Sequence, residues 1–235
     1  MTDVTLERPV PGPSDHATPE PFDHPTPGPS DHHTLEPAIR PASGPSVLHL
    51  VRHGESTWNL AGRIQGQSAQ AGGLTAAGRA QAHLTADLLA GRPTRPAAII
   101  ASDLIRARET AEIIATRLGL PLEFDSELRE QQLGELEGQR LDSPFADDPT
   151  AQHSVDRLWR EPFRRPSGGE SIADMYARVH RALRHHAVSR PGVEIVLVTH
   201  GGPVRMASAP EPPTPGVPVP RVGVDNASIT SITVP

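Results

Sequence analysis

The fold can be worked out from VLHLVRHG, residues 47–54, a short apolar run between Pro45 and Gly54 that ends in an Arg-His-Gly step. A run of this length, bounded by turn-forming residues, is typical of a strand buried on both faces. The same pattern returns in EIVLVTHGG, residues 194–202, where the strongest strand pattern in the chain leads directly into a second His-Gly step. Reacting groups in parallel sheets gather beyond the carboxyl ends of the strands, so His53 and His200 together predict a functional site.

Further strands and helices alternate between these two runs. Residues 97–101 are a second apolar strand, and apolar residues at helical spacing predict helices over residues 76–90, 104–118 and 172–190. Their expected N-cap residues are Thr75, then Ser102 or Asp103, then Ser171. Gly91, Gly119 and the Pro191-Gly192 pair are expected to end them. This alternation predicts an α/β fold, a three-layer α/β/α sandwich with a mostly parallel central sheet covered on both faces.

Proline marks two unusual segments. Of the 27 prolines, 11 lie in residues 1–46 and seven in residues 203–220. The first segment repeats PGPSDH at residues 11–16 and 27–32 and holds seven acidic residues against two arginines. Such a segment buries too little apolar surface to offset its ordering entropy. We therefore expect residues 1–45 to be a disordered Pro/His/acidic tail and residues 46–235 to be the folded domain.

Composition excludes several classes of protein. All 22 basic residues are Arg, and the chain has neither Lys nor Cys, which rules out thiolate nucleophiles, Schiff-base lysines and disulfide frameworks. Beyond the tail, 21 acidic residues balance 20 arginines, which argues against nucleic acid as a partner. The chain has neither an apolar run of the roughly 20 residues needed to span a bilayer nor a signal-peptide pattern, so we expect no membrane partner and a cytoplasmic location.

Five short blocks, in order, carry a resemblance to a known family. They are RHGESTWN at residues 52–59, SDLIRARETA at 102–111, LREQQLGELEG at 128–138, GGES at 168–171 and VTHGG at 198–202. Together they resemble the histidine phosphatase superfamily, the phosphoglycerate-mutase-like proteins, over about residues 47–234. The acidic, proline-rich tail has no counterpart in the family pattern.

The resemblance implies a site for phosphoryl transfer without metal or other cofactor. His53 would be the nucleophile that forms a phosphohistidine, attacking as neutral imidazole, and Glu130 the general acid and base. The implied phosphate ligands are Arg52, Asn59, Arg106 and a charged His200; Gln65, Gly66 and Gly201 would line the substrate-binding mouth. The neighbouring arginines should lower the pKa of His53, because they disfavour a cationic ring.

Three functions remain open, with hydrolysis of a small phosphorylated metabolite first. A cofactor-dependent phosphoglycerate mutase is the second, although only 37 residues separate Glu130 from Gly168 where the mutases carry a longer insertion. That span could hold an anionic substrate tail through Arg157, Arg160, Arg164 and Arg165. The third is a catalytically weak phosphatase-fold binding protein, because prolines after His200 allow only a turn or two of helix. A homodimer also remains open. His83, His153, His180, His185 and His186 are expected to face solvent.

Overall fold

The computed structural model describes residues 44–141, 150–209 and 211–235. Five strands form a single sheet, in the order β3-β2-β4-β1-β5. The strands are β1 (Ser46–Arg52), β2 (Ala98–Ala101), β3 (Leu122–Phe124), β4 (Glu194–Thr199) and β5 (Ile229–Val234). β1 begins at Ser46, while residues 1–43 of the expected tail lie outside the described residues, so the division into tail and domain stays a prediction.

The sheet is mostly parallel, as the alternation of strands and helices predicts. β1 pairs with β4, and β2 pairs with both β4 and β3, all in parallel. Only β5 runs antiparallel, along the outer edge of β1. In the parallel register Arg52 lies opposite Thr199, so His53 and His200 follow neighbouring strands at the same level.

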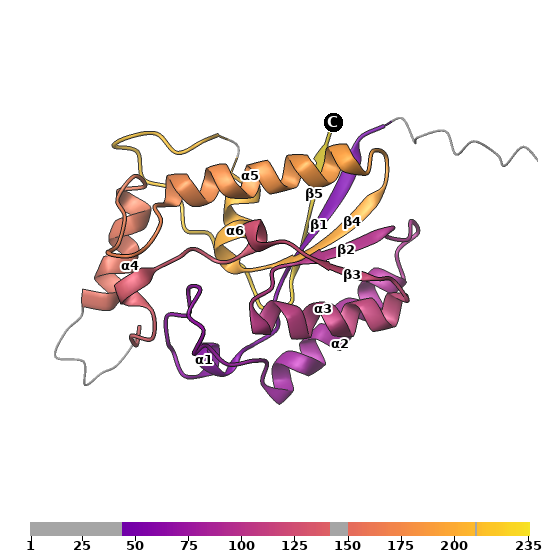
Figure 1. Cartoon of the computed structure of the whole chain (residues 1–235), viewed down its shortest axis with the longest axis horizontal. Helices are drawn as coiled ribbons and strands as arrows, with labels where there is room; N and C mark the ends of the chain where they lie inside the picture. The colour runs from indigo at the N-terminus through magenta and orange to yellow at the C-terminus, as the bar shows by residue number, and fades with distance from the viewer. Residues whose placement is uncertain (1–43, 142–149, 210) are drawn as a thin grey trace, which may run out of the picture. The chain divides into compact units, whose positions relative to one another are not determined.

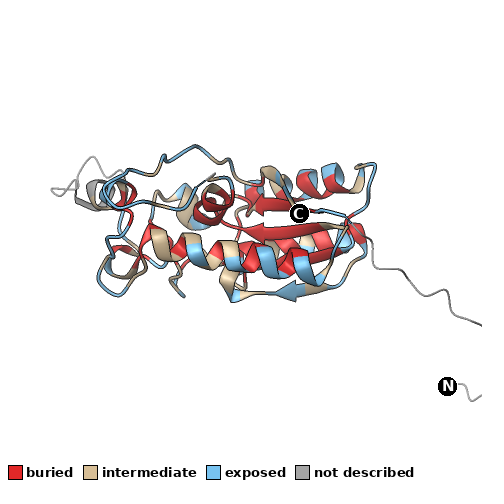
Figure 2. Cartoon of the chain, turned by 90° about the horizontal axis from the view of Figure 1, so that it is seen from above, coloured by how far each residue is buried: buried red, intermediate tan, exposed pale blue. Residues whose placement is uncertain are grey.

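Helices cover both faces of this sheet (Figure 1). α2 (Ala76–Ala90) and α3 (Ile105–Leu118) pack together on one face, and α5 (Ile172–Ser189) and α6 (Gly201–Ala207) cover the other. The central strands are buried throughout and separate two apolar clusters, one on each side (Figure 2). Two further helices, α1 (Thr57–Leu60) and α4 (Thr150–Arg160), contribute residues to the pocket described below. Single 3-10 turns occur at Ser126–Leu128 and Gly134–Leu136.

The helix caps follow the sequence expectation at two of three positions. Thr75 accepts a hydrogen bond from Gly78 N, and Ser171 forms a capping box with Asp174. The expected cap of α3 at Ser102 or Asp103 is wrong, since the helix begins after Leu104 without a side-chain cap. Both candidate side chains are engaged elsewhere: the Ser102 hydroxyl contacts His200, and the Asp103 carboxylate binds a guanidinium.

One of the histidines expected at the surface is buried. His186, on α5, is 5% exposed, and its Nε2 lies 2.8 Å from the Asp125 carboxylate. Its helical position faces the sheet, so the ring packs inward and the carboxylate provides its partner. His83 and His185 are exposed, while His180 is half-buried against the carbonyl of Met206. The side chain of His153 lies outside the described residues.

The proline-rich stretch after His200 shortens α6 to seven residues, which confirms the expected turn or two. In the part of the chain that the structure describes, no helix is both long enough and apolar enough to cross a membrane.

Candidate active site

Two histidines meet at the carboxyl ends of β1 and β4, where the sequence places them. The His53 and His200 rings lie 5.1 Å apart, centroid to centroid, and are 2% and 0% exposed. Gly54, next to His53, crosses Gly78 of α2 so closely that a Cβ on it would lie 2.3 Å from the Gly78 carbonyl oxygen. Glycine is therefore required after His53 to hold this turn against the helix.

Hydrogen bonds determine which nitrogen of His53 is free to react. Nδ1 lies 2.7 Å from the Gly54 carbonyl oxygen, which can only accept, so Nδ1 carries the proton. Nε2 accepts a hydrogen bond from Arg106 Nε at 3.2 Å. Burial, together with the charges of Arg106 and Arg52, lowers the pKa of His53 well below its usual 6.5. The ring is thus neutral at pH 7, with its lone pair on Nε2.

Arg106 lies in the first turn of α3 and is 1% exposed. Beyond His53, it donates from Nη2 to the Gly66 carbonyl oxygen at 2.9 Å. Burial lowers its pKa to about 10 against the favourable charge of Glu130, so the guanidinium stays charged at neutral pH. Arg108, two residues on, is exposed and lies over the Phe124 ring instead.

The His200 ring is buried next to the His53 ring and does not line the pocket. Its Nε2 lies 2.8 Å from the Ser102 hydroxyl, while its Nδ1 is buried without a partner among the described residues. Burial and the nearby Arg106 lower the pKa of His200 well below 6.5. The sequence analysis expects a charged His200 against a bound phosphate, and that stays a prediction; in the ligand-free site no anion offsets the cost of burying an imidazolium.

A pocket of about 180 Å³ opens beside His53. The sequence-predicted residues that line it are Arg52, His53, Asn59, Gln65, Gly66, Arg106, Glu130 and Gly201. The Asn59 side-chain oxygen accepts hydrogen bonds from Ser56, and Gln65 accepts from the Ser56 hydroxyl at 2.8 Å. Ser56 thereby leaves the amide donors of both side chains free.

Arg52 is tethered next to this pocket. Its Nη1 donates to the Val224 carbonyl oxygen, but its Nε is buried without a partner among the described residues. A Cβ on Gly201 would lie 3.7 Å from this Nε and 2.9 Å from Nη1 of Arg205. Two guanidiniums therefore flank the space beside Gly201.

Glu130 also lines this pocket. Its carboxylate accepts hydrogen bonds from Gly202 N, at 3.1 and 3.2 Å, and from its neighbour Gln131 N at 2.9 Å. A Cβ on Gly202 would lie only 2.1 Å from Glu130 Oε1. The second glycine of VTHGG thus allows the carboxylate to approach the start of α6.

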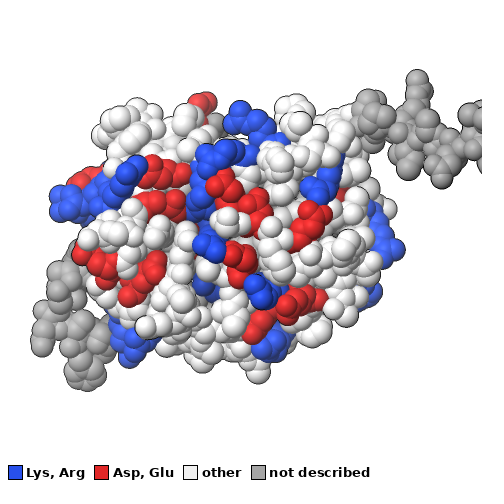
Figure 3. Space-filling view, in the orientation of Figure 1, with Lys and Arg blue, Asp and Glu red and all other residues white. Residues whose placement is uncertain are grey.

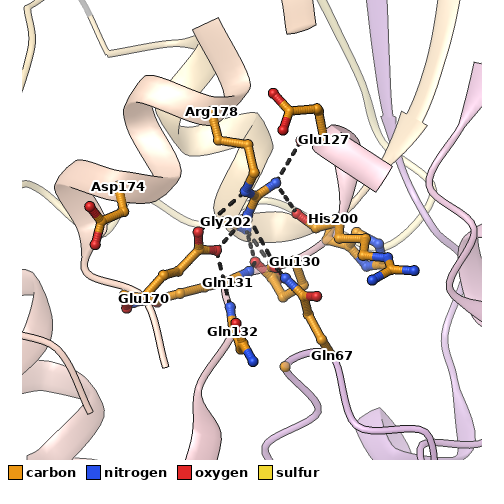
Figure 4. Close-up of polar contacts among 12 residues, drawn as sticks. Gln67, Glu127, Glu130, Gln131, Gln132, Glu170, Asp174, Arg178, His200 and Gly202 are labelled. Atoms are coloured by element: carbon orange, nitrogen blue, oxygen red, sulfur yellow. Dashed lines mark hydrogen bonds and ion pairs between the residues drawn. The ribbon is translucent and has the colours of Figure 1, made fainter. Parts of the chain in front are cut away.

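Arg178 of α5 orders the segment that carries Glu130, a role that the sequence analysis missed (Figure 4). It donates to the carbonyl oxygens of Glu127, Arg129 and Glu130, at 2.6, 2.9 and 3.3 Å. Its guanidinium also pairs with Glu170 at 2.5 Å, and Glu170 itself accepts from Gln132 N. Glu170 belongs to the GGES block, so that block contributes to the site indirectly, through Arg178. An arginine on a helix gives no sequence signal for such a contact.

The four arginines between Glu130 and Gly168, for which the sequence allows either an anionic substrate tail or a solvated surface patch, do not line the pocket. Arg157 and Arg164 pair with Glu161, Arg165 pairs with Asp174, and none of the three lines the cavity. Arg160 is also exposed and absent from the lining. On the face shown in Figure 3, acidic and basic side chains are interspersed in this way. The mouth is lined instead by Arg63, Arg205 and Arg221, none of which the sequence analysis selected.

Among the described residues, no group of three or more His, Asp or Glu side chains is arranged to hold a metal ion. Asp147 and Asp148, which precede Pro149 in the sequence, lie outside the described residues.

Comparisons with known proteins agree on one family. The model of the histidine phosphatase superfamily (branch 1) matches residues 48–235. A metal-independent phosphoserine phosphatase from Arabidopsis thaliana is 38% identical over 157 residues, which cover 66% of this chain and 64% of the plant protein. A probable phosphoglycerate mutase from Salmonella paratyphi C is 39% identical over 154 residues, 66% of this chain and 69% of the bacterial protein.

The same agreement holds in three dimensions. The structure of a mycobacterial glucosyl-3-phosphoglycerate phosphatase in complex with VO3 superposes with a TM-score of 0.66 at 34% identity. The superposition covers 79% of this chain and 90% of the mycobacterial one.

Proposed function

Because this chain belongs to the histidine phosphatase superfamily and is an enzyme of that family, we propose that it hydrolyses phosphomonoesters of small metabolites through a phosphohistidine on His53. The observation that carries the proposal is the state of the His53 ring. Its lone pair is on Nε2, where it accepts a hydrogen bond from Arg106. The pKa of the ring is depressed, and the ring borders a pocket lined by three buried or half-buried arginines, Arg52, Arg106 and Arg205. That combination suits in-line attack on phosphorus.

In the first half-reaction, His53 Nε2 forms a bond to phosphorus as the bond from phosphorus to the alcohol oxygen breaks. The departing alkoxide needs a proton, and the Glu130 carboxyl, which also lines the pocket, donates it. In the second half-reaction, Glu130 takes a proton from water, the water oxygen bonds to phosphorus, and the bond to Nε2 breaks. Phosphate leaves, and both side chains return to their starting states.

Arginines stabilise the charge on the transferring group. Arg52 offers an Nε–H without a partner, and Arg106 lies against the nucleophile, so both can donate to equatorial phosphate oxygens. Asn59 adds its amide donor.

His200 can contribute as a neutral donor. The Ser102 oxygen accepts from Leu104 N at 3.3 Å, which leaves its own proton available to donate to His200 Nε2. The neutral ring then carries its proton on Nδ1, the atom that has no partner in the ligand-free site.

The test is phosphate release from an aryl phosphate, with EDTA present, combined with acid-labile labelling by a radioactive substrate. We expect the wild type to release phosphate and to carry label, His53→Ala to do neither, and the exposed control His83→Ala to match the wild type. EDTA-sensitive release would contradict a metal-independent mechanism. Release no greater than that of His53→Ala would favour a protein that only binds phosphorylated ligands.

Mutase activity is the second candidate, because a probable phosphoglycerate mutase is 39% identical to the chain. Interconversion of 3- and 2-phosphoglycerate faster than phosphate release would reverse the order of the two functions.

A further inference from the structure

The pocket beside His53 contains more positive charge than one phosphate group uses. Its lining includes five arginines and a single carboxylate, that of Glu130. Two of the arginines, Arg52 and Arg106, lie at the nucleophile. The other three, Arg63, Arg205 and Arg221, lie beyond it, where the non-reacting part of a substrate would be bound.

Arg205 is the most constrained of these three. It is half-buried on α6, its Nε donates to the Val222 carbonyl oxygen at 2.5 Å, and its guanidinium lies over the Trp159 ring at 5.6 Å. A Cβ on Gly201 would lie 2.9 Å from Arg205 Nη1 and 3.7 Å from Arg52 Nε, so the two guanidiniums lie on the same side of Gly201. The side chain is thus fixed in place with one nitrogen directed toward the site.

The surroundings of Arg205 leave its charge without a counter-ion. Among the ion pairs between described residues, none involves Arg205, whereas Arg221 pairs with Asp156 at 3.2 Å. Burial first, and then repulsion from Arg221 and Arg52, lowers the pKa of Arg205 against the attraction of Glu130. Three like charges held this close favour the entry of an anion, which relieves their repulsion.

The proline-rich segment after α6 builds this arrangement. It contributes Arg221 itself, and its backbone carbonyls at Val222 and Val224 hold the guanidiniums of Arg205 and Arg52. Val219 N in turn donates to the Trp159 carbonyl oxygen at 2.8 Å, which anchors the segment to α4. The chain that follows α6 therefore places Arg221 at the pocket and holds Arg205 and Arg52 beside it.

We propose that Arg205 and Arg221 form a second anion subsite, so that the preferred substrate is a small phosphomonoester bearing a carboxylate or a second phosphate. This proposal rests on the phosphatase function proposed above.

The test compares substrates that differ in one group. Glycerol 3-phosphate has a hydroxymethyl group where 3-phosphoglycerate has a carboxylate, and glycerol 1,3-bisphosphate has a second phosphate. We expect wild-type kcat/KM to be at least roughly 10-fold higher for 3-phosphoglycerate or for glycerol 1,3-bisphosphate than for glycerol 3-phosphate. A hydrogen bond to a charged group is worth about that much. Whichever ester shows the preference identifies carboxylate or phosphate as the recognised group.

Two variants assign the preference to residues. Arg205→Gln should reduce it by about 10-fold, mainly through KM, because it removes binding energy shared by ground and transition states. Arg221→Gln should reduce it by about threefold, since that side chain is exposed and already paired. Arg157→Gln is the matched control: it removes the same charge from an exposed site on α4 that does not line the pocket. Thermal melting checks the fold of each, and Arg221→Gln remains informative if the more buried Arg205 variant does not fold.

The outcomes separate the two proposals. Equal kcat/KM for all three esters, each hydrolysed by the wild type and not by His53→Ala, would refute the subsite and leave the phosphatase function standing. An equal loss of preference in Arg157→Gln would also refute it, because overall charge would then account for the effect. Failure of the wild type to hydrolyse any ester, including an aryl phosphate, would refute the phosphatase function and the subsite with it.

Discussion

Replacing Gly202 by alanine places a methyl group where the Glu130 carboxylate lies. The new Cβ would be 2.1 Å from Glu130 Oε1 and 2.9 Å from Met175 Sδ, whereas ordinary van der Waals contact begins near 3.4 Å. Met175 is fully buried in the core and cannot retreat, so the carboxylate must move by more than about 1 Å. The movement also weakens the two hydrogen bonds from Gly202 N to Glu130.

The expected cost follows from the role proposed for Glu130. Misplacing a catalytic group by about 1 Å can cost roughly 100-fold in rate, which corresponds to about 2.7 kcal/mol of transition-state stabilisation. The loss should depend on the leaving group. Nitrophenolate leaves without a proton, so kcat/KM, which reports only the steps up to formation of the phosphohistidine, should fall much less for an aryl phosphate than for an alkyl phosphate.

The assay measures kcat/KM for p-nitrophenyl phosphate and glycerol 3-phosphate in the wild type, Gly202→Ala and Gly91→Ala. Gly91 is the control because it ends α2 at a φ of −83° and a Cβ there meets nothing closer than 3.5 Å. Equal losses for the two substrates in Gly202→Ala would refute Glu130 as the proton donor. Wild-type rates for both would refute the steric argument itself.

Three further predictions concern stability and the segment around Glu130. Burial, followed by the charge of Arg106, holds the pKa of both His53 and His200 well below 6.5, so the unfolded chain binds more protons below that pH. As the pH decreases from 6.5, the free energy of unfolding should therefore decrease by about 1.4 kcal/mol per pH unit for each ring. Urea titrations between pH 7 and pH 5 measure this decrease, which should be smaller in His200→Asn than in the wild type. Ser171→Ala removes the N-cap of α5 and should lower the free energy of unfolding by about 1 kcal/mol in the same assay at pH 7; an unchanged midpoint would contradict the capping box. In Arg178→Lys a single ammonium group cannot bind three carbonyl oxygens and Glu170 at once, so kcat should fall roughly 10-fold while KM changes little. A change confined to KM would contradict a positioning role.

Local patterns were sufficient for the framework of the fold. The apolar runs at residues 47–51 and 194–199 are buried strands because each is short, continuous and bounded by turn residues. The cap at Ser171 follows from a polar residue placed just before a helical apolar pattern. The cap of α3 could not be predicted, because Ser102 and Asp103 are drawn to His200 and Arg129, which are distant in sequence.

The predicted site residues come together for the same reason that the sheet forms. Motifs at the ends of neighbouring parallel strands must lie at one edge, and His53 and His200 do. Sequence reasoning did not find Arg178, Arg205 and Arg221, since each acts through a contact with backbone or pocket rather than within a motif. For Arg157 and Arg165 it allowed either a substrate-binding role or a solvated surface position, and their nearest carboxylates, Glu161 and Asp174, hold them at the surface.

The sequence by itself determined the family, the α/β class and a set of candidate site residues, because those depend on short-range periodicity and on motifs with few alternatives. Only the tertiary structure decided the protonation of His53 and His200, which depends on burial and on charges brought from other elements. It also decided which arginines face the substrate. Arg221 belongs to no motif, and it lines the pocket only because α6 ends early and Val219 is anchored to Trp159 of α4 before the chain reaches β5.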